Sequence, residues 1–148
     1  MLSETLISLF ERDLSRVIDE LHLYQSESNL WKTEGNISNS AGNLALHLIG
    51  NLKTYIGKEI GSFDYVRNRD LEFADKNVPR EKIVADLSDT IAIIKDSLKS
   101  VSDEDLKKEY PLLVLSGKTS MEYFLIHLAT HLNYHLGQIN YHRRLIEK

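Results

Sequence analysis

The chain contains no cysteine among its 148 residues. This absence excludes disulfide bonds, iron–sulfur clusters, zinc–thiolate sites and a catalytic cysteine from the chain. Strong metal ligands can then come only from histidine and from acidic side chains, and any thiol chemistry needs a thiol supplied by another molecule. The sequence therefore directs the search for a site to its six histidines.

Long hydrophobic runs are also lacking. No stretch approaches about 20 consecutive apolar residues, and residues 1–20 mix acidic and basic side chains with apolar ones. We therefore expect no membrane segment and a cytoplasmic protein. The net charge is −4, and the basic residues are scattered without an aromatic-interleaved patch, so we expect no nucleic-acid partner.

The length and composition suit one self-sufficient domain spanning residues 1–148, with 42% hydrophobic and 27% charged residues. Apolar residues recur at steps of three and four in four stretches, which is typical of amphipathic helices. The first three run over 6–24, 44–56 and 83–101, and the fourth follows Thr119. Ser3 is a candidate N-cap for the first, and Thr119 with Glu122 has the capping-box pattern for the last.

Four amphipathic helices without a strand set or a repeat predict an all-α four-helix bundle. Two connections are longer than the usual helix-to-helix loop of about 2–8 residues, so we expect long crossover connections. The first, over 26–40, is polar and holds the only tryptophan, Trp31. The second, over 62–77, is highly charged and is expected to be a linker without a helix of its own.

Four of the histidines fall within residues 127–142. His131 and His135 are four residues apart, so both rings share one helix face and can aim at a single metal ion. His127 and His131 have the same spacing, and spacing alone leaves the two pairs equivalent. His142 precedes Arg143 and Arg144 and is expected at a solvated helix end, whereas we assign His22 a structural role.

A third ligand is predicted in the second helix, where His47 has an asparagine one turn away on each side. Asn43 and Asn51 could orient the imidazole or a metal-bound water, although packing and capping are the alternative. Trp31 is either a buried anchor or a wall of the substrate pocket. Glu34 is the nearest candidate for a general base, but an exposed loop carboxylate is usually only solvated.

Two segments, NSAGNLALHLIGNL and THLNYHLGQINYH, resemble the DinB-like superfamily of bacterial four-helix-bundle metalloenzymes, and the similarity covers essentially the whole chain. It extends to the uncharacterised branch with a Leu-Trp loop before an Asn-rich second helix. The resemblance implies a divalent-metal site of His47, His131 and His135, and so favours this set over His127. Many relatives carry a basic residue where this chain has Leu136, so an anionic contact is not expected there.

The resemblance also implies an activity. Characterised relatives include transferases that use low-molecular-weight thiols such as bacillithiol or mycothiol, and an isomerase branch that uses mycothiol. We therefore expect S-transfer to a small-molecule electrophile, with zinc or nickel as the ion, a thiol as cosubstrate and a homodimer as the assembly. The alternatives are hydrolysis by a metal-bound hydroxide and a noncatalytic, metal-binding dimeric module. No catalytic side chain is assigned.

Overall fold

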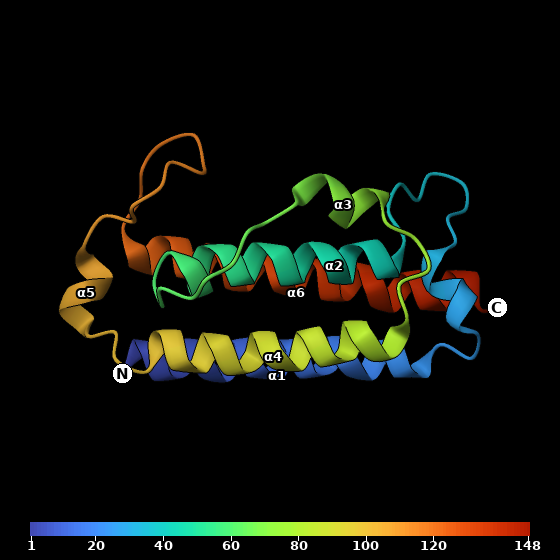
Figure 1. Ribbon diagram of the computed structural model, residues 1–148, viewed down its shortest axis with the longest axis horizontal. Coiled ribbons are helices and arrows are strands. Elements are labelled where there is room, and N and C mark those ends of the chain that lie inside the picture. The colour runs from blue at the N-terminus through green and yellow to red at the C-terminus, as the bar shows by residue number, and fades with distance from the viewer.

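Four helices lie side by side along the longest dimension of the protein (Figure 1). The computed structural model describes all residues 1–148, and it is helical apart from its loops and one isolated β-bridge. α1 packs against α4 and α6, and α2 packs against the same two helices. The four helices are α1 (Leu2–Leu23), α2 (Ala41–Leu52), α4 (Arg80–Leu98) and α6 (Met121–Ile146).

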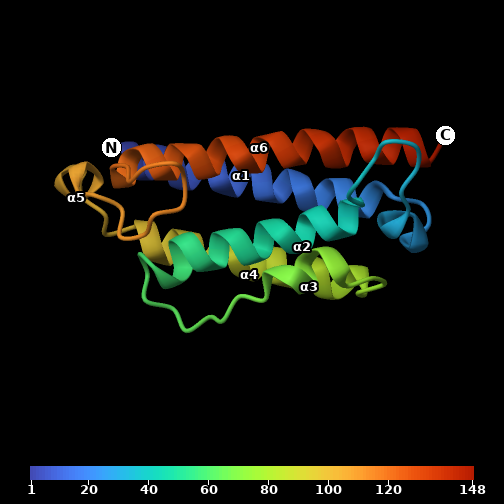
Figure 2. The same ribbon diagram turned by 90° about the horizontal axis from the view of Figure 1, so that it is seen from above.

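The helix directions require one long crossover. α1 and α6 run one way, whereas α2 and α4 run the other (Figures 1 and 2). Because α2 and α4 are parallel, residues 59–79 must return along the length of the protein before α4 begins. The other two long connections stay at one end each, so residues 59–79 form the one crossover, where the sequence predicted at least one.

The crossover carries a helix that the sequence pattern did not predict. α3 (Arg69–Ala74) packs on α2, and the side chain of Asn68 caps it by accepting a hydrogen bond from the Leu71 N–H. The expectation of a helix-free linker over 62–77 was therefore wrong. A helix of six residues is too short to display an amphipathic period, and its contacts with α2 stabilise it.

The core consists of the apolar stripes that the sequence predicts. Each long helix contributes side chains that are almost fully buried, which places the hydrophobic stabilisation between the four helices. No helix combines the length and the apolar composition needed to cross a membrane. The buried stripes include Leu6, Phe10, Leu14, Val17, Leu21, Leu44, Leu48, Leu52, Ile56, Ile83, Leu87, Ile94, Leu98, Leu125, Leu128, Leu132 and Ile139.

Two helix starts differ from the expected caps. α6 is capped by Ser120, whose hydroxyl accepts from the Tyr123 N–H, because the backbone carbonyl of Thr119 is engaged by the Tyr110 N–H at 2.8 Å. α1 begins at Leu2, so Ser3 lies inside the helix and is buried. Both predictions were wrong by one or two residues, which is the usual uncertainty of helix ends.

Three short helical segments complete the chain. η1 (Glu27–Trp31) is a 3₁₀ turn in the first connection, and α5 (Asp103–Lys107) carries a capping box between Ser102 and Asp105. α2 continues into a π-helical segment, η2 (Lys53–Lys58). π-helical turns often lie at functional sites, and this one begins two residues after Asn51.

Gly42→Ala tests how tightly the first connection packs on α2. A Cβ at Gly42 would lie 2.7 Å from the ring of Trp31, so we expect the substitution to lower the free energy of unfolding by about 1–3 kcal/mol. Gly137→Ala in α6 is the matched control, because a Cβ there meets nothing within 4 Å. It should raise stability by up to about 1 kcal/mol through helix propensity. Urea unfolding of the metal-free proteins measures both, and equal stability of the two variants would contradict the packing.

Candidate metal centre

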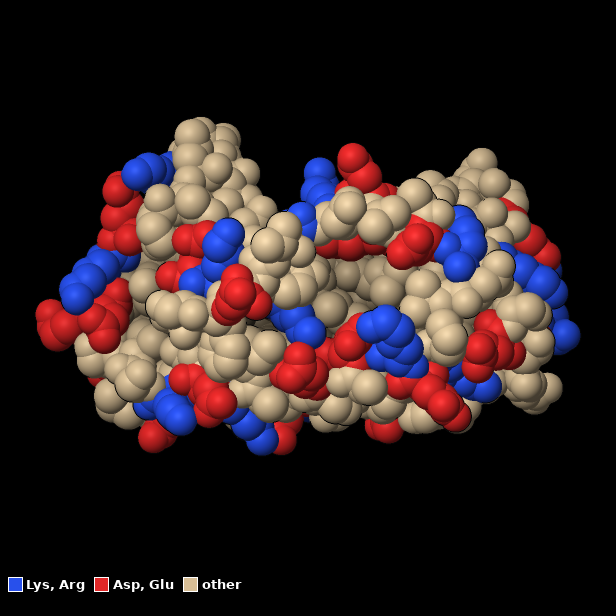
Figure 3. All heavy atoms as spheres, viewed as in Figure 1, with Lys and Arg blue, Asp and Glu red and all other residues tan.

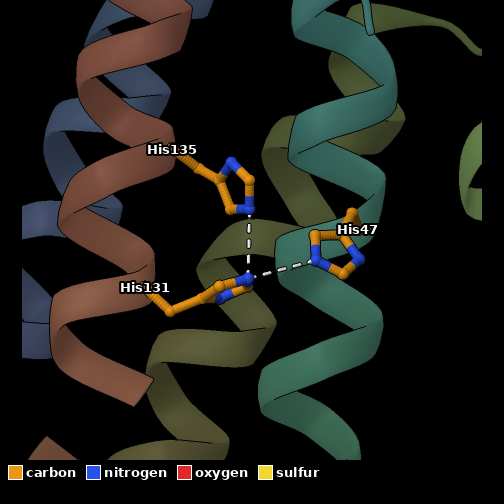
Figure 4. A group of neighbouring side chains, drawn as sticks. All are labelled: His47, His131 and His135. Atoms are coloured by element: carbon orange, nitrogen blue, oxygen red, sulfur yellow. Dashed lines mark hydrogen bonds between the residues drawn. The ribbon is translucent and has the colours of Figure 1, made fainter. Parts of the chain in front are cut away.

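Three histidine rings from two helices converge on one point between them (Figure 4). His47 comes from α2, and His131 and His135 come from successive turns of α6. The Nε2 atom of His131 lies 3.3 Å from Nε2 of His47 and 3.0 Å from Nε2 of His135. Imidazole nitrogens around a tetrahedral zinc ion, each at about 2.1 Å, are about 3.4 Å apart. The spacing therefore suits one ion bound by three imidazoles.

The ring of His47 is held by a buried ion pair from the crossover. Its Nδ1 lies 3.0 Å from Oε1 of Glu72, and Arg67 donates to both oxygens of that carboxylate at 2.8 and 2.9 Å. Since an ionised carboxylate only accepts hydrogen bonds, Nδ1 of His47 carries the proton. In the neutral ring, the Nε2 lone pair is then free for a metal, as in carboxylate–histidine–metal arrangements.

Glu72 is ionised although it is only 6% exposed. Burial opposes its ionisation, but the hydrogen bonds from His47 and Arg67 and the charge of Arg67 outweigh burial and hold the pKa of Glu72 below its usual value. The same pairing keeps the pKa of Arg67 raised despite its burial. Both charges therefore persist around neutral pH, and His47 faces a permanent hydrogen-bond acceptor.

Two residues of α2 make room for this carboxylate and hold it there. A Cβ at Gly50 would overlap the carboxylate of Glu72, so only glycine allows the side chain to approach the helix. The amide of Asn43 donates to the backbone carbonyls of Glu72 and Asp75, both at 2.9 Å. The side chain of Asn43 therefore holds the helix that carries Glu72 and makes no hydrogen bond to a histidine.

His135 has the same protonation pattern through a different partner. Its Nδ1 lies 2.6 Å from the amide oxygen of Gln138, one turn further along α6. An amide oxygen only accepts, so Nδ1 carries the proton and Nε2 presents its lone pair to the other two rings. Gln138 of the H-x-x-x-H-x-G-Q element thus orients the His135 ring, which gives this sequence pattern a physical role.

His131 lies at the centre of the cluster and is neutral at physiological pH. Burial, and then the charges of the neighbouring histidines His135, His47 and His127, lower the pKa of His131 to about 4. Burial also lowers the pKa of His135, against the opposing effect of the hydrogen bond that its Nδ1–H donates to Gln138. Metal ligation requires neutral imidazole, so the two rings of α6 are in the state that binds a divalent ion.

The remaining histidines lie outside the cluster. His22 is exposed, and His127 stacks on His131 with ring centroids 6.3 Å apart. His142 is 3% exposed, so its expected place at a solvated helix end was wrong. The Tyr24 hydroxyl donates to Nδ1 of His142, and Nε2 of His142 donates to the Lys32 carbonyl, both at 2.7 Å. The first connection covers this end of α6. The local sequence of residues 142–144 does not predict that burial.

A cavity of about 310 Å³ opens beside His47 and His131. Asn51 is one of the lining residues, whereas Trp31 and Glu34 are not. The ring of Trp31 packs instead against Gly42 near the start of α2, and Glu34 is exposed in the first connection. The complete lining is His47, Asn51, Tyr55, Arg67, Arg69, Val114, Phe124, His127, Leu128 and His131.

Sequence reasoning missed Arg67 and Glu72. Both lie in the charged stretch 62–77, where they looked like ordinary solvated side chains. One local signal was present, because Asn68 followed by acidic residues at 70 and 72 resembles a helix N-terminus. Their contact with His47 joins residues 20 or more positions apart, and no local pattern indicates such a pairing.

The lowered pKa of His131 makes the stability of the metal-free protein depend on pH. The pKa of His131 is about 4 in the folded state and 6.5 ordinarily, so the unfolded state binds more protons between these limits. We expect stability to rise with pH across this window, by about 3 kcal/mol over the whole shift and by about 2 kcal/mol between pH 5 and pH 7. Urea unfolding with a chelator at pH 5 and pH 7 measures the change. His131→Asn should reduce it, and an unchanged pH dependence in that variant would contradict the assignment.

Comparison with known proteins gives a family and no activity. Residues 4–148 match the model of a family described as a protein of unknown function (DUF1572). A search of curated proteins found no match. The family match covers nearly the whole chain, including the crossover, the three histidines and all four long helices except the first two residues of α1. The chain therefore belongs to the DUF1572 family.

Proposed function

We propose that the protein is a metal-dependent enzyme with a three-histidine site, acting as a thiol-dependent S-transferase on a small electrophile. The observation that carries the proposal is the convergence of three Nε2 atoms, from His47, His131 and His135, whose outer nitrogens are protonated on two of the three rings. We also assign the arrangement of α1, α2, α4 and α6 to the DinB-like four-helix bundle, on the resemblance of its sequence motifs.

The donor set fits a divalent ion such as zinc or nickel. When bound, the ion supplies Lewis acidity and a position at which a thiol or a water loses its proton near neutral pH. Three neutral imidazoles do not reduce the charge of the ion, which favours that deprotonation. In the transfer, the thiol sulfur forms a bond to the electrophilic carbon, the bond from that carbon to the leaving group breaks, and the thiol proton is released.

The surrounding residues position the three histidines and favour S-transfer over hydrolysis. Glu72 and Gln138 fix the two rings, and Asn43 fixes the helix that carries Glu72. A hydrolase would need a base near the bound water. Glu72 is engaged by His47 and Arg67, and Glu34 lies outside the cavity, so neither carboxylate is available. This supports S-transfer over the hydrolytic alternative.

Asn51 and Trp31 take different parts in this proposal. Asn51 lines the cavity and contacts the substrate. Trp31 acts at one remove, because its ring against Gly42 fixes the start of the helix that carries His47. We further propose a homodimer. α6 exposes several large apolar side chains that a second copy could cover, namely Tyr123, Ile126, Tyr134, Tyr141 and Leu145.

The two possible histidine pairs of α6 give a matched test. We expect His135→Ala to lose bound metal, because it removes one of the three converging Nε2 atoms, whereas His127→Ala should keep it. Elemental analysis of protein purified without a histidine tag measures both. Metal retained in His135→Ala, or lost in His127→Ala, would show that the ligand set is wrong. Metal-free wild-type protein that takes up neither zinc nor nickel would refute the metal site.

Glu72→Gln tests the orientation of His47. The amide cannot accept two hydrogen bonds from Arg67 and one from His47 as the carboxylate does, so the ring loses its fixed direction. We expect metal affinity to fall by about 10–100-fold, the usual effect of removing such a partner. Competition with a chromophoric chelator measures the affinity, and Glu34→Gln is the control that should leave it unchanged.

Activity is tested with the metal-loaded protein. Low-molecular-weight thiols are offered together with small alkyl electrophiles, and the loss of free thiol is followed. Wild-type protein should consume thiol, and His135→Ala should fall to the background rate. Metal-loaded protein that consumes no thiol and exchanges no ligand would indicate a structural ion in a closed site.

A further inference from the structure

The cavity beside the histidines has an unusual charge balance. Two arginines of the crossover, Arg67 and Arg69, line it together with His127 and His131, and no aspartate or glutamate is among the lining residues. The guanidinium of Arg67 is paired with Glu72 through Nε and Nη2. Arg69 is exposed and has no ion pair within the chain, and its guanidinium carbon lies 6.0 Å from the centre of the Phe73 ring. One cationic side chain is therefore unneutralised at the cavity.

Asn51 adds a polar group that the fold itself does not satisfy. The residue is 7% exposed, and its Oδ1 is fully buried without a hydrogen-bond partner. Its side chain makes no hydrogen bond within the chain, and it lies on the cavity wall one turn after His47. Oδ1 is an acceptor that an oxygen-bearing anion cannot satisfy, so the group that Asn51 offers to a ligand is its NH2, which donates to no atom of the chain.

We propose that this cavity binds the oxyanion group of a small molecule, a carboxylate or a phosphate. Arg69 and the free N–H groups of Arg67 supply the charged contacts, and the Asn51 amide donates a hydrogen bond. The cavity adjoins two of the three histidines, so the bound molecule would be a reactant of the enzyme. Only this role rests on the proposed function. The cavity gives the chain a source of anion recognition that Leu136 does not provide.

The size and the surroundings of the cavity favour a small anion. A volume of about 310 Å³ admits a metabolite-sized molecule and not a polymer. Across the face shown in Figure 3, lysine and arginine side chains alternate with aspartate and glutamate, without a broad basic region. Val114, Phe124 and Leu128 supply apolar wall, so the bound molecule combines an anionic group with an apolar part.

The test uses the His135→Ala variant, because His135 is a metal ligand that does not line the cavity. Chelator-treated wild-type protein serves as a second metal-free sample. Succinate, inorganic phosphate and the neutral succinamide are titrated in turn by calorimetry. We expect one of the two anions to bind and succinamide not to bind, which also separates a carboxylate ligand from a phosphate ligand.

Two substitutions and one control assign the binding to the cavity. Arg69→Gln should weaken anion binding at least tenfold, whereas Arg144→Gln, on an exposed arginine far along α6, should leave it unchanged. Asn51→Leu should weaken binding and also raise the urea midpoint, because it removes an unsatisfied buried amide. A merely structural asparagine would give the opposite shift in the midpoint.

The outcomes separate this inference from the proposed metalloenzyme. The proposal of an anion site would be wrong if neither anion bound or if succinamide bound equally well. It would also be wrong if the Arg69→Gln variant bound the anion as tightly as wild-type protein does. If wild-type protein binds the anion but no metal, and the Arg69→Gln variant loses anion binding, the anion site stands and the metal proposal falls. If metal binds and neither anion does, the metal proposal stands alone. Circular dichroism of each variant verifies that its helices are intact.

Discussion

The site depends on one buried carboxylate. Removing Glu72 from water is unfavourable unless the charge is paired, and the structure pairs it with Arg67 on one side and His47 on the other. This pairing explains features that look unrelated along the chain. Gly50 leaves space for the carboxylate, and Asn43 binds the backbone that carries it. The same ion pair therefore stabilises the crossover and orients the ring of His47.

The crossover acts as a wall of the site as well as a connection. α2 and α6 supply the three histidines, but two helices alone leave the outer nitrogen of His47 without a partner. The parallel course of α2 and α4 forces residues 59–79 to return along the protein (Figure 2), and α3 within this return packs on α2. The topology thus places Arg67, Arg69 and Glu72 beside the ligands, and a short loop could not do so.

Local periodicity explains what the sequence could predict. The apolar stripes and the His131–His135 pair follow from helical spacing, and the placement of His47 on the second helix follows from the same rule. The features that the sequence could not predict depend on contacts between segments far apart in the chain. Glu72 meets His47 from a six-residue helix with no period of its own, and the first connection buries His142. Both are contacts between distant segments, whose local sequences look like solvated charge.

The electrostatics of the metal centre and of the cavity support each other. Three neutral imidazoles leave a divalent ion with its full charge, and the one nearby carboxylate is already balanced by Arg67. Arg69 adds a further positive charge with no acidic side chain on the cavity wall. With an ion bound, the region has an excess of positive charge in a partly buried setting where water screens it weakly. Under the two proposals, an anionic reactant would offset that excess, so a bound metal would strengthen the attraction of the arginines and the anion would in turn favour the metal-loaded site.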